Sequence, residues 1–201
     1  MAGRPGCGDR SVVLTLAVVA AVGIGLISGG KLTELARLEI RWWPVLLAGV
    51  ALQAYGVGHW TTESLAGVPL RQAVFVGTHA VILAVAAANL GLAGLRIVVL
   101  GAAANLAALL ANGGLMPVSA EARVAAGHQT ALDSLATGAA VLGSKGVVVP
   151  PEQANLWLLT DILVIPRPFP ITAIFSIGDL LVALGLGFLI VRTMRRRPDG
   201  E

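Results

Sequence analysis

Two carboxylates late in the chain are the residues best suited to do chemistry. Asp161 lies in a short apolar run, and Asp179 lies in the long apolar run that follows. The two runs are separated by Pro166, Pro168 and Pro170, so a turn there could bring the carboxylates face to face. Two carboxyl groups held close together share one proton, so one serves as an acid while the other serves as a base. With a water between them, such a pair forms the machinery of an aspartyl hydrolase.

Each acid also has a structural interpretation. Ser176 precedes Asp179 at the spacing of a capping box, in which a serine and an acid satisfy the free backbone amides of a helix start. Asp161 is close enough in sequence to Arg167 to form an ion pair with it at a membrane interface. The sequence therefore leaves a catalytic pair and two structural acids as alternatives.

Other polar residues inside or beside apolar runs form a second candidate set. Gln53, His79 and Asn105 each lie about 10 Å from the outer end of an apolar run, at a rise of ~1.5 Å per residue. They could form one polar layer beneath the second acid, either as a substrate pocket or as hydrogen bonds between helices, worth about 0.6 kcal/mol each. Asn112 and Gly114 either stop a helix or let backbone N–H groups approach a ligand.

Metal and cofactor sites are not expected. Cys7 is the single cysteine, and His59, His79 and His128 are too scattered for a zinc motif. The net charge is +3, but the basic residues do not form the aromatic-basic surface of a nucleic-acid-binding protein. The expected partners are the lipid bilayer and, as a ligand, a lipid or a membrane peptide, while the oligomeric state is left open.

The elements that position these residues follow from the composition. Of 201 residues, 56% are hydrophobic and 12% are charged, whereas soluble domains carry about 25% charged residues. The apolar residues come in runs near the ~20 residues that cross a bilayer. The expected fold class is therefore all-α, a polytopic membrane helical bundle with five transmembrane spans plus one re-entrant or interfacial helix.

The expected organisation is a polar N-terminal tail at 1–10, a single membrane domain at 11–193 and a basic cytoplasmic tail at 194–201. The spans are expected at about 11–29, 44–59, 72–90, 97–112 and 171–192. The segment 115–153 is too polar to cross and is expected outside, either folded over the bundle or as a loose loop. The run 155–165 has about half the length of a span, which favours a re-entrant or interfacial helix.

Basic residues set the expected orientation. Under this scheme eight of the 14 lysines and arginines fall on one side, namely Lys31, Arg37, Arg41, Arg96, Arg192, Arg195, Arg196 and Arg197. Because cytoplasmic loops carry an excess of these residues, the N-terminus is expected outside and the C-terminus inside the bacterial cytoplasmic membrane.

Three segments carry a family resemblance: NGGLMPVS at Asn112–Ser119, LWLLTDILVIP at Leu156–Pro166 and FSIGDLL at Phe175–Leu181. They resemble a bacterial family of small polytopic membrane proteins that carries a domain-of-unknown-function label. The resemblance covers essentially the whole chain after the polar tail. It implies a bacterial cytoplasmic-membrane protein without an established activity.

A second, local resemblance concerns the acids. Asp161-Ile162-Leu163 and Ser176-Ile177-Gly178-Asp179 are similar to the two aspartate segments of lipoprotein signal peptidase (type II), and Asn112-x-Gly114 is similar to its Asn-x-Gly element. This chain has serine and glycine where that family has asparagine and alanine before the second acid. The resemblance implies an intramembrane aspartyl hydrolase as the alternative to a scaffold or small-ligand-binding protein, and it leaves open whether the chain is an enzyme.

Overall fold

The computed structural model describes residues 9–59, 64–65, 67–127, 146–169 and 171–196. Most of the two expected tails therefore lies outside the described residues. The middle of the expected outer segment, at 128–145, lies outside them as well.

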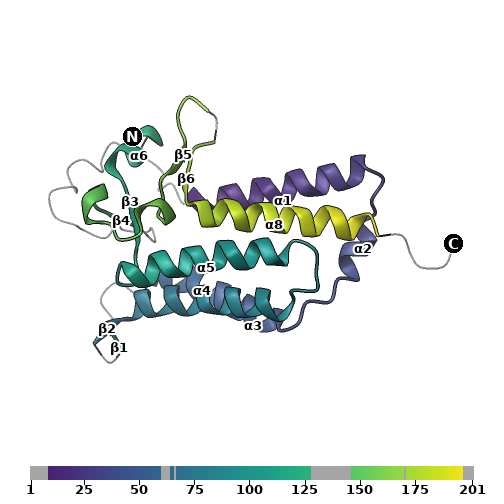
Figure 1. The fold of residues 1–201 in the computed structure, drawn as a ribbon, viewed down its shortest axis with the longest axis horizontal. Coiled ribbons are helices and arrows are strands. Elements are labelled where there is room, and N and C mark those ends of the chain that lie inside the picture. Colours follow the sequence, from purple (N-terminus) through teal and green to yellow (C-terminus); the bar gives the residue numbers. More distant parts are fainter. Residues whose placement is uncertain (1–8, 60–63, 66, 128–145, 170, 197–201) are drawn as a thin grey trace.

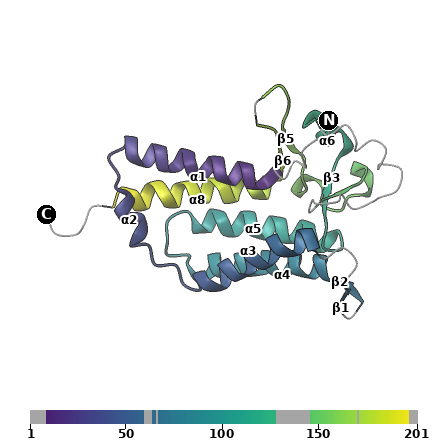
Figure 2. The ribbon, with the colours of Figure 1, turned by 180° about the vertical axis from the view of Figure 1, so that it is seen from behind.

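Long helices form a bundle along the long axis of the molecule (Figures 1 and 2). They are α1 (Asp9–Ile27), α3 (Trp43–His59), α4 (Leu70–Ala88), α5 (Leu95–Ala111) and α8 (Ile177–Met194). Helix α8 packs against α1 and α5, α4 packs on α5, and α3 packs on α4. The short helix α2 (Leu32–Ala36) lies at the end of the bundle where α8 ends. Each of the five long helices overlaps an expected span, because long apolar runs favour helices.

Two of these helices meet both the length and the hydropathy expected of a membrane span. Helices α4 and α8 are long and apolar enough to cross a membrane, with mean hydropathies of 1.6 and 1.8. The apolar stretches Val13–Ile27, Trp43–Tyr55 and Leu95–Ala111 of the other three helices are shorter. The fold is thus mostly helical, with two helices among the described residues that could cross a membrane by length and composition.

A small mixed unit covers one end of the bundle, beyond the start of α8 (Figure 1). We call it the cap and define it as residues 115–127, 146–169 and 171–176. It contains the parallel strands β3 (Met116–Val118) and β4 (Gly146–Val148), helix α6 (Ala120–Ala125), the 3₁₀ helices η2 (Pro151–Gln153) and η3 (Trp157–Leu159), and the antiparallel strands β5 (Leu163–Ile165) and β6 (Ala173–Phe175). A separate two-residue hairpin, β1 (Ser64–Leu65) and β2 (Val68–Pro69), precedes α4.

The cap corrects the expectation for the run 155–165, which is not a re-entrant or interfacial helix. Its regular structure consists of the 3₁₀ helix η3 at Trp157–Leu159 and the strand β5 at Leu163–Ile165. The β-branched residues Ile162, Val164 and Ile165 favour a strand, and β6 supplies the pairing partner. For the same reason the last helix begins at Ile177 rather than at 171, since Ala173–Phe175 is used by β6. The all-α prediction therefore describes the bundle and not the cap.

Each part has its own buried apolar cluster. In the cap, Val118, Ala122 and Val148 pack with Ile174, so the two small sheets and α6 share one core. In the bundle, Ala86, Leu95, Val98 and Leu189 join α4, α5 and α8. Between them, Met116 packs on Ala108 and Leu109 of α5, which attaches the cap to the bundle.

Helices α5 and α8 pack closely against each other, and glycines make this contact possible. A Cβ on Gly101 would meet the Gly178 carbonyl oxygen at 2.5 Å, and a Cβ on Gly185 would meet the Gly94 carbonyl oxygen at 2.8 Å. Because the helices are antiparallel, glycines seven residues apart on each helix meet in two layers. We call these four residues the glycine seam. The seam joins α5 to α8, two helices that lie far apart in the sequence.

Candidate functional site

Asp179, the second predicted acid, lies in a group of hydrogen bonds between α5 and α8. The Asn105 Nδ2 group donates to Asp179 Oδ1 at 2.7 Å, and the Ser176 hydroxyl donates to Asn105 Oδ1 at 2.7 Å. The Ser176 backbone N–H donates to Asp179 Oδ2 at 3.2 Å, and the Asp179 N–H donates to Ser176 Oγ at 2.9 Å. Asn105, Ser176 and Asp179, here called the polar triad, are all buried.

Local sequence explains the position of the triad. Ser176 is the N-cap of α8 and Asp179 completes the capping box, as the Ser-x-x-Asp spacing predicted. Gly178 leaves room for Asn105, because a Cβ there would collide with the Asn105 side chain. The glycine seam thus brings an asparagine of α5 onto the first turn of α8. Both carboxylate oxygens of Asp179 accept a described hydrogen bond, which makes this acid a helix cap and a bridge between helices.

The first predicted acid belongs to the cap. The Asp161 N–H donates to the Pro117 carbonyl at 3.1 Å, and Asp161 forms a parallel bridge with Val118 at the edge of β3. Leu163 pairs with Phe175, which directly precedes the N-cap of α8, and Asp161 lies two residues before Leu163 in the chain. The Pro-rich turn therefore brings both acids to the same end of α8. The Asp161 side chain is 5% exposed.

Arg167, the predicted partner of Asp161, is placed at the end of α6. Its backbone N–H donates to the Ala125 carbonyl at 3.1 Å, and its guanidinium packs on Gly127. Gly127 has a φ of +88°, so the chain leaves α6 in the left-handed region that glycine tolerates. Arg167 therefore contacts α6 through its backbone, and its side chain contacts Gly127 just after the end of α6.

The remaining predicted residues of the polar layer are buried in α3 and α4. Gln53 is 6% exposed and His79 is 8% exposed. The His79 ring nitrogen Nδ1 lies 2.8 Å from the Phe75 carbonyl oxygen of its own helix. Beside it, the Thr78 hydroxyl donates to the Gly49 carbonyl at 3.3 Å and links α4 to α3. Of the three predicted residues, Asn105 is the one with a described bond to Asp179.

Asn112 and Gly114 end α5 and hold the cap. The Gly114 N–H donates to the Leu109 carbonyl at 2.7 Å with a φ of +83°, which confirms the predicted helix stop. The Asn112 side chain donates to the Asn155 carbonyl at 2.8 Å and accepts from the Asn155 N–H at 2.9 Å. In return, the Asn155 side chain donates to the Ala111 carbonyl at 2.9 Å. Two asparagines therefore fasten the cap to the end of α5.

Replacing Asn112 by alanine should loosen this attachment. The change removes two hydrogen bonds to Asn155, each worth about 0.5 to 1.5 kcal/mol. We expect faster hydrogen exchange in residues 115–127 while α5 and α8 keep their protection. The control is Gln153→Ala, an exposed residue of η2, which should leave exchange unchanged. Equal exchange in both variants would show that the asparagines do not hold the cap.

Sequence reasoning missed the partner of Asp179 and the glycine seam. The spacing of seven residues between Gly94 and Gly101, repeated between Gly178 and Gly185, is the signal that could have found the seam. Within the described residues, no three His, Cys, Asp or Glu side chains gather in a way that could hold a metal ion.

Comparison with known proteins gives one match. Residues 37–191 match the model of a protein family described as a family of unknown function (DUF5317). No curated protein and no solved structure matches the chain.

Proposed function

Because the chain belongs to DUF5317, a family of unknown function, we propose its function from its geometry. The chain is a multi-pass protein of the bacterial cytoplasmic membrane in which α1, α3, α4, α5 and α8 all cross. It acts without catalysis, as a scaffold that holds the cap at the outer surface and offers the bundle to a lipid or membrane-peptide ligand.

The observation that carries this proposal is the reversed polarity of the bundle. Large apolar side chains face outward on α1, α3, α5 and α8, among them Val19, Val45, Leu100 and Leu184, which are 63%, 53%, 64% and 57% exposed. Polar side chains lie inside, among them Gln53, Thr78, His79, Asn105, Asp179 and Thr193. A water-soluble bundle needs the opposite arrangement, whereas lipid tails favour this one.

The packing of the bundle also supports membrane crossing by the other three long helices. Helices α1, α3 and α5 lie alongside α4 and α8 for most of their length (Figure 2). If α4 and α8 cross, their packed neighbours lie at the same depth. A helix of 17 residues, the length of α3 and α5, spans about 25 Å at ~1.5 Å per residue, close to the ~30 Å hydrocarbon core.

The distribution of charge supports the orientation. The end away from the cap carries seven described basic residues, Lys31, Arg37, Arg41, Arg96, Arg192, Arg195 and Arg196. Trp42 and Trp43 lie at the same end and are 55% and 56% exposed, as expected for an interfacial belt. The positive-inside rule then puts this end in the cytoplasm and the cap outside.

Reporter fusions test the topology. Fusions after Arg41 and Arg96 should give cytoplasmic activity, and fusions after Gly67 and Gly127 should give extracytoplasmic activity. Successive fusion points along the chain are separated by one long helix, so the reporter signal should change sides from each fusion point to the next. Reporter activity on the same side of the membrane for the fusions after Gly67 and Arg96 would mean that α4 does not cross, and the multi-pass proposal would be wrong.

The engaged state of Asp179 supports a function without catalysis. Both Asp179 oxygens accept hydrogen bonds, from Asn105 and from Ser176, which gives this acid a structural role at the start of α8. The effect of replacing this acid, described in the Discussion, tests that part of the proposal.

A further inference from the structure

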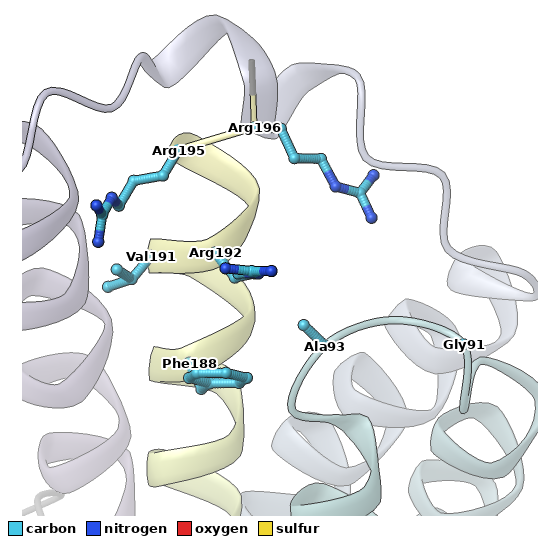
Figure 3. A pocket seen from close by; sticks show the side chains of 7 residues that line it. All are labelled: Gly91, Ala93, Phe188, Val191, Arg192, Arg195 and Arg196. Carbon is cyan, nitrogen blue, oxygen red and sulfur yellow. The ribbon is translucent and has the colours of Figure 1, made fainter. Parts of the chain in front are cut away.

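The end of the bundle away from the cap holds a hollow lined by arginines (Figure 3). Its volume is about 580 Å³, and it lies between the turn that joins α4 to α5 and the last turns of α8. A second hollow of about 400 Å³ shares Gly91, Ala93 and Phe188 with the first and adds Arg96. Because they share these residues, we treat the two hollows as one feature, the basic groove.

The groove is positively charged along its rim. Arg192, Arg195 and Arg196 line the first hollow, and Arg96 lines the second. In Figure 3 the guanidinium groups of Arg192 and Arg196 lie on the side of α8 that faces the turn with Ala93, whereas Arg195 extends to the other side. Neither hollow is lined by an aspartate or glutamate of the described residues. The groove therefore presents exposed positive charge without a carboxylate in its lining.

An apolar stripe continues from the groove along α8. Leu180, Leu184 and Phe188 precede Arg192 at intervals of four residues, which places all four on one helix face. The three apolar side chains are 39%, 57% and 54% exposed. The stripe is therefore an outward apolar surface that ends at the arginine on the rim.

We propose that the basic groove binds an acidic phospholipid of the inner leaflet, with its phosphate on Arg192 and Arg196 and an acyl chain along the stripe. The inference rests on the proposed membrane topology. Arginine presents several N–H donors in a planar fork that matches a phosphate group. Basic pockets between membrane helices on the cytoplasmic side suit anionic headgroups. A free phosphate would use the arginines alone, so the adjoining stripe favours a lipid.

The test is binding of short-chain lipids to the purified full-length protein in neutral detergent. We expect phosphatidylglycerol to bind at least ten-fold more tightly than phosphatidylcholine, and inorganic phosphate to bind far more weakly than either. The double variant Arg192→Gln, Arg196→Gln should lose at least ten-fold in phosphatidylglycerol affinity. Phe188→Ala keeps every charge and should weaken both lipids by a similar factor, because it shortens the stripe.

The matched control is Arg37→Gln, which removes one positive charge from the same end of the protein. Arg37 lies on the exposed side of α2 and pairs with Glu34 at 3.1 Å, outside the groove. This variant should keep the full preference for phosphatidylglycerol. Thermal unfolding without lipid should be the same for all variants, since the changed side chains are exposed.

Three results would overturn the inference. Equal affinity for phosphatidylglycerol and phosphatidylcholine would exclude headgroup recognition. Equal losses of affinity per removed charge in the double variant and in Arg37→Gln would mean a general charge effect. Binding of inorganic phosphate as tightly as the lipid would mean a free-anion site. Lipid binding in detergent does not depend on orientation, so the reporter fusions can fail while this test succeeds, and the reverse.

Discussion

Replacing Asp179 by alanine should destabilise the detergent-solubilised protein by about 2 to 6 kcal/mol, the cost of leaving two buried donors unsatisfied at about 1 to 3 kcal/mol each. The donors are the Ser176 N–H and the Asn105 side-chain amide, both of which lose their acceptor. Ser176 is fully buried and Asn105 is 3% exposed, so water does not replace the carboxylate easily. The measurement is the loss of folded protein with temperature or denaturant, followed by circular dichroism.

Asp179→Asn separates the structural role from a catalytic one. The side-chain NH2 group of the new asparagine would replace one carboxylate oxygen and would face a donor, either the Ser176 N–H or the Asn105 amide. Asn105 could turn over to accept it, but the Ser176 hydroxyl proton would then lose its acceptor. We therefore expect a smaller loss of about 1 to 3 kcal/mol, the cost of one unsatisfied buried group. A purely catalytic acid would instead tolerate asparagine without loss of stability.

The control for both variants is Glu152→Gln, an exposed acid of η2 in the cap, which should leave stability unchanged. A double-mutant cycle of Asn105→Ala with Asp179→Ala should be non-additive, because both changes remove the same hydrogen bond. Unchanged stability of Asp179→Asn, together with loss of the cellular phenotype, would favour the hydrolase hypothesis over a scaffold.

Features that depend only on residues close together in the sequence could be predicted. The capping box of Ser176 and Asp179 and the helix stop at Gly114 depend on local spacing and backbone freedom, and both are present. The positions of the long helices also follow from local composition, since each apolar run favours a helix by itself. These interactions do not require knowledge of which segments meet in space.

Features that join distant segments could not be predicted in this way. The run 155–165 is apolar enough for a short helix, and only its pairing with Ala173–Phe175 makes part of it a strand. The distance of Asn105 from the end of its helix could be estimated from the number of residues. Its hydrogen bond to Asp179 could not, because that bond depends on the packing of α5 against α8. The spacing of the glycines does not by itself identify which helix packs against α5, so the glycine seam was missed.

Replacing Gly101 by alanine tests the contact on which the polar triad depends. The added Cβ would meet the Gly178 carbonyl oxygen at 2.5 Å and Leu181 Cβ at 2.9 Å, so the two helices must move apart. We expect destabilisation by about 1 to 3 kcal/mol, the usual cost of overpacking. Gly185→Ala should have a similar effect, because its Cβ would meet the Gly94 carbonyl oxygen at 2.8 Å.

The matched control is Gly77→Ala in α4, where an added Cβ meets nothing within 4 Å. Alanine favours a helix over glycine by about 0.5 to 1 kcal/mol, so this variant should be neutral or more stable. Separation of α5 from α8 should also pull Asn105 from Asp179. The non-additivity between Asn105→Ala and Asp179→Ala should therefore shrink when it is measured in the Gly101→Ala background. Full coupling in that background, or equal stability of Gly101→Ala and Gly77→Ala, would mean that the glycine seam does not set the geometry of the polar triad.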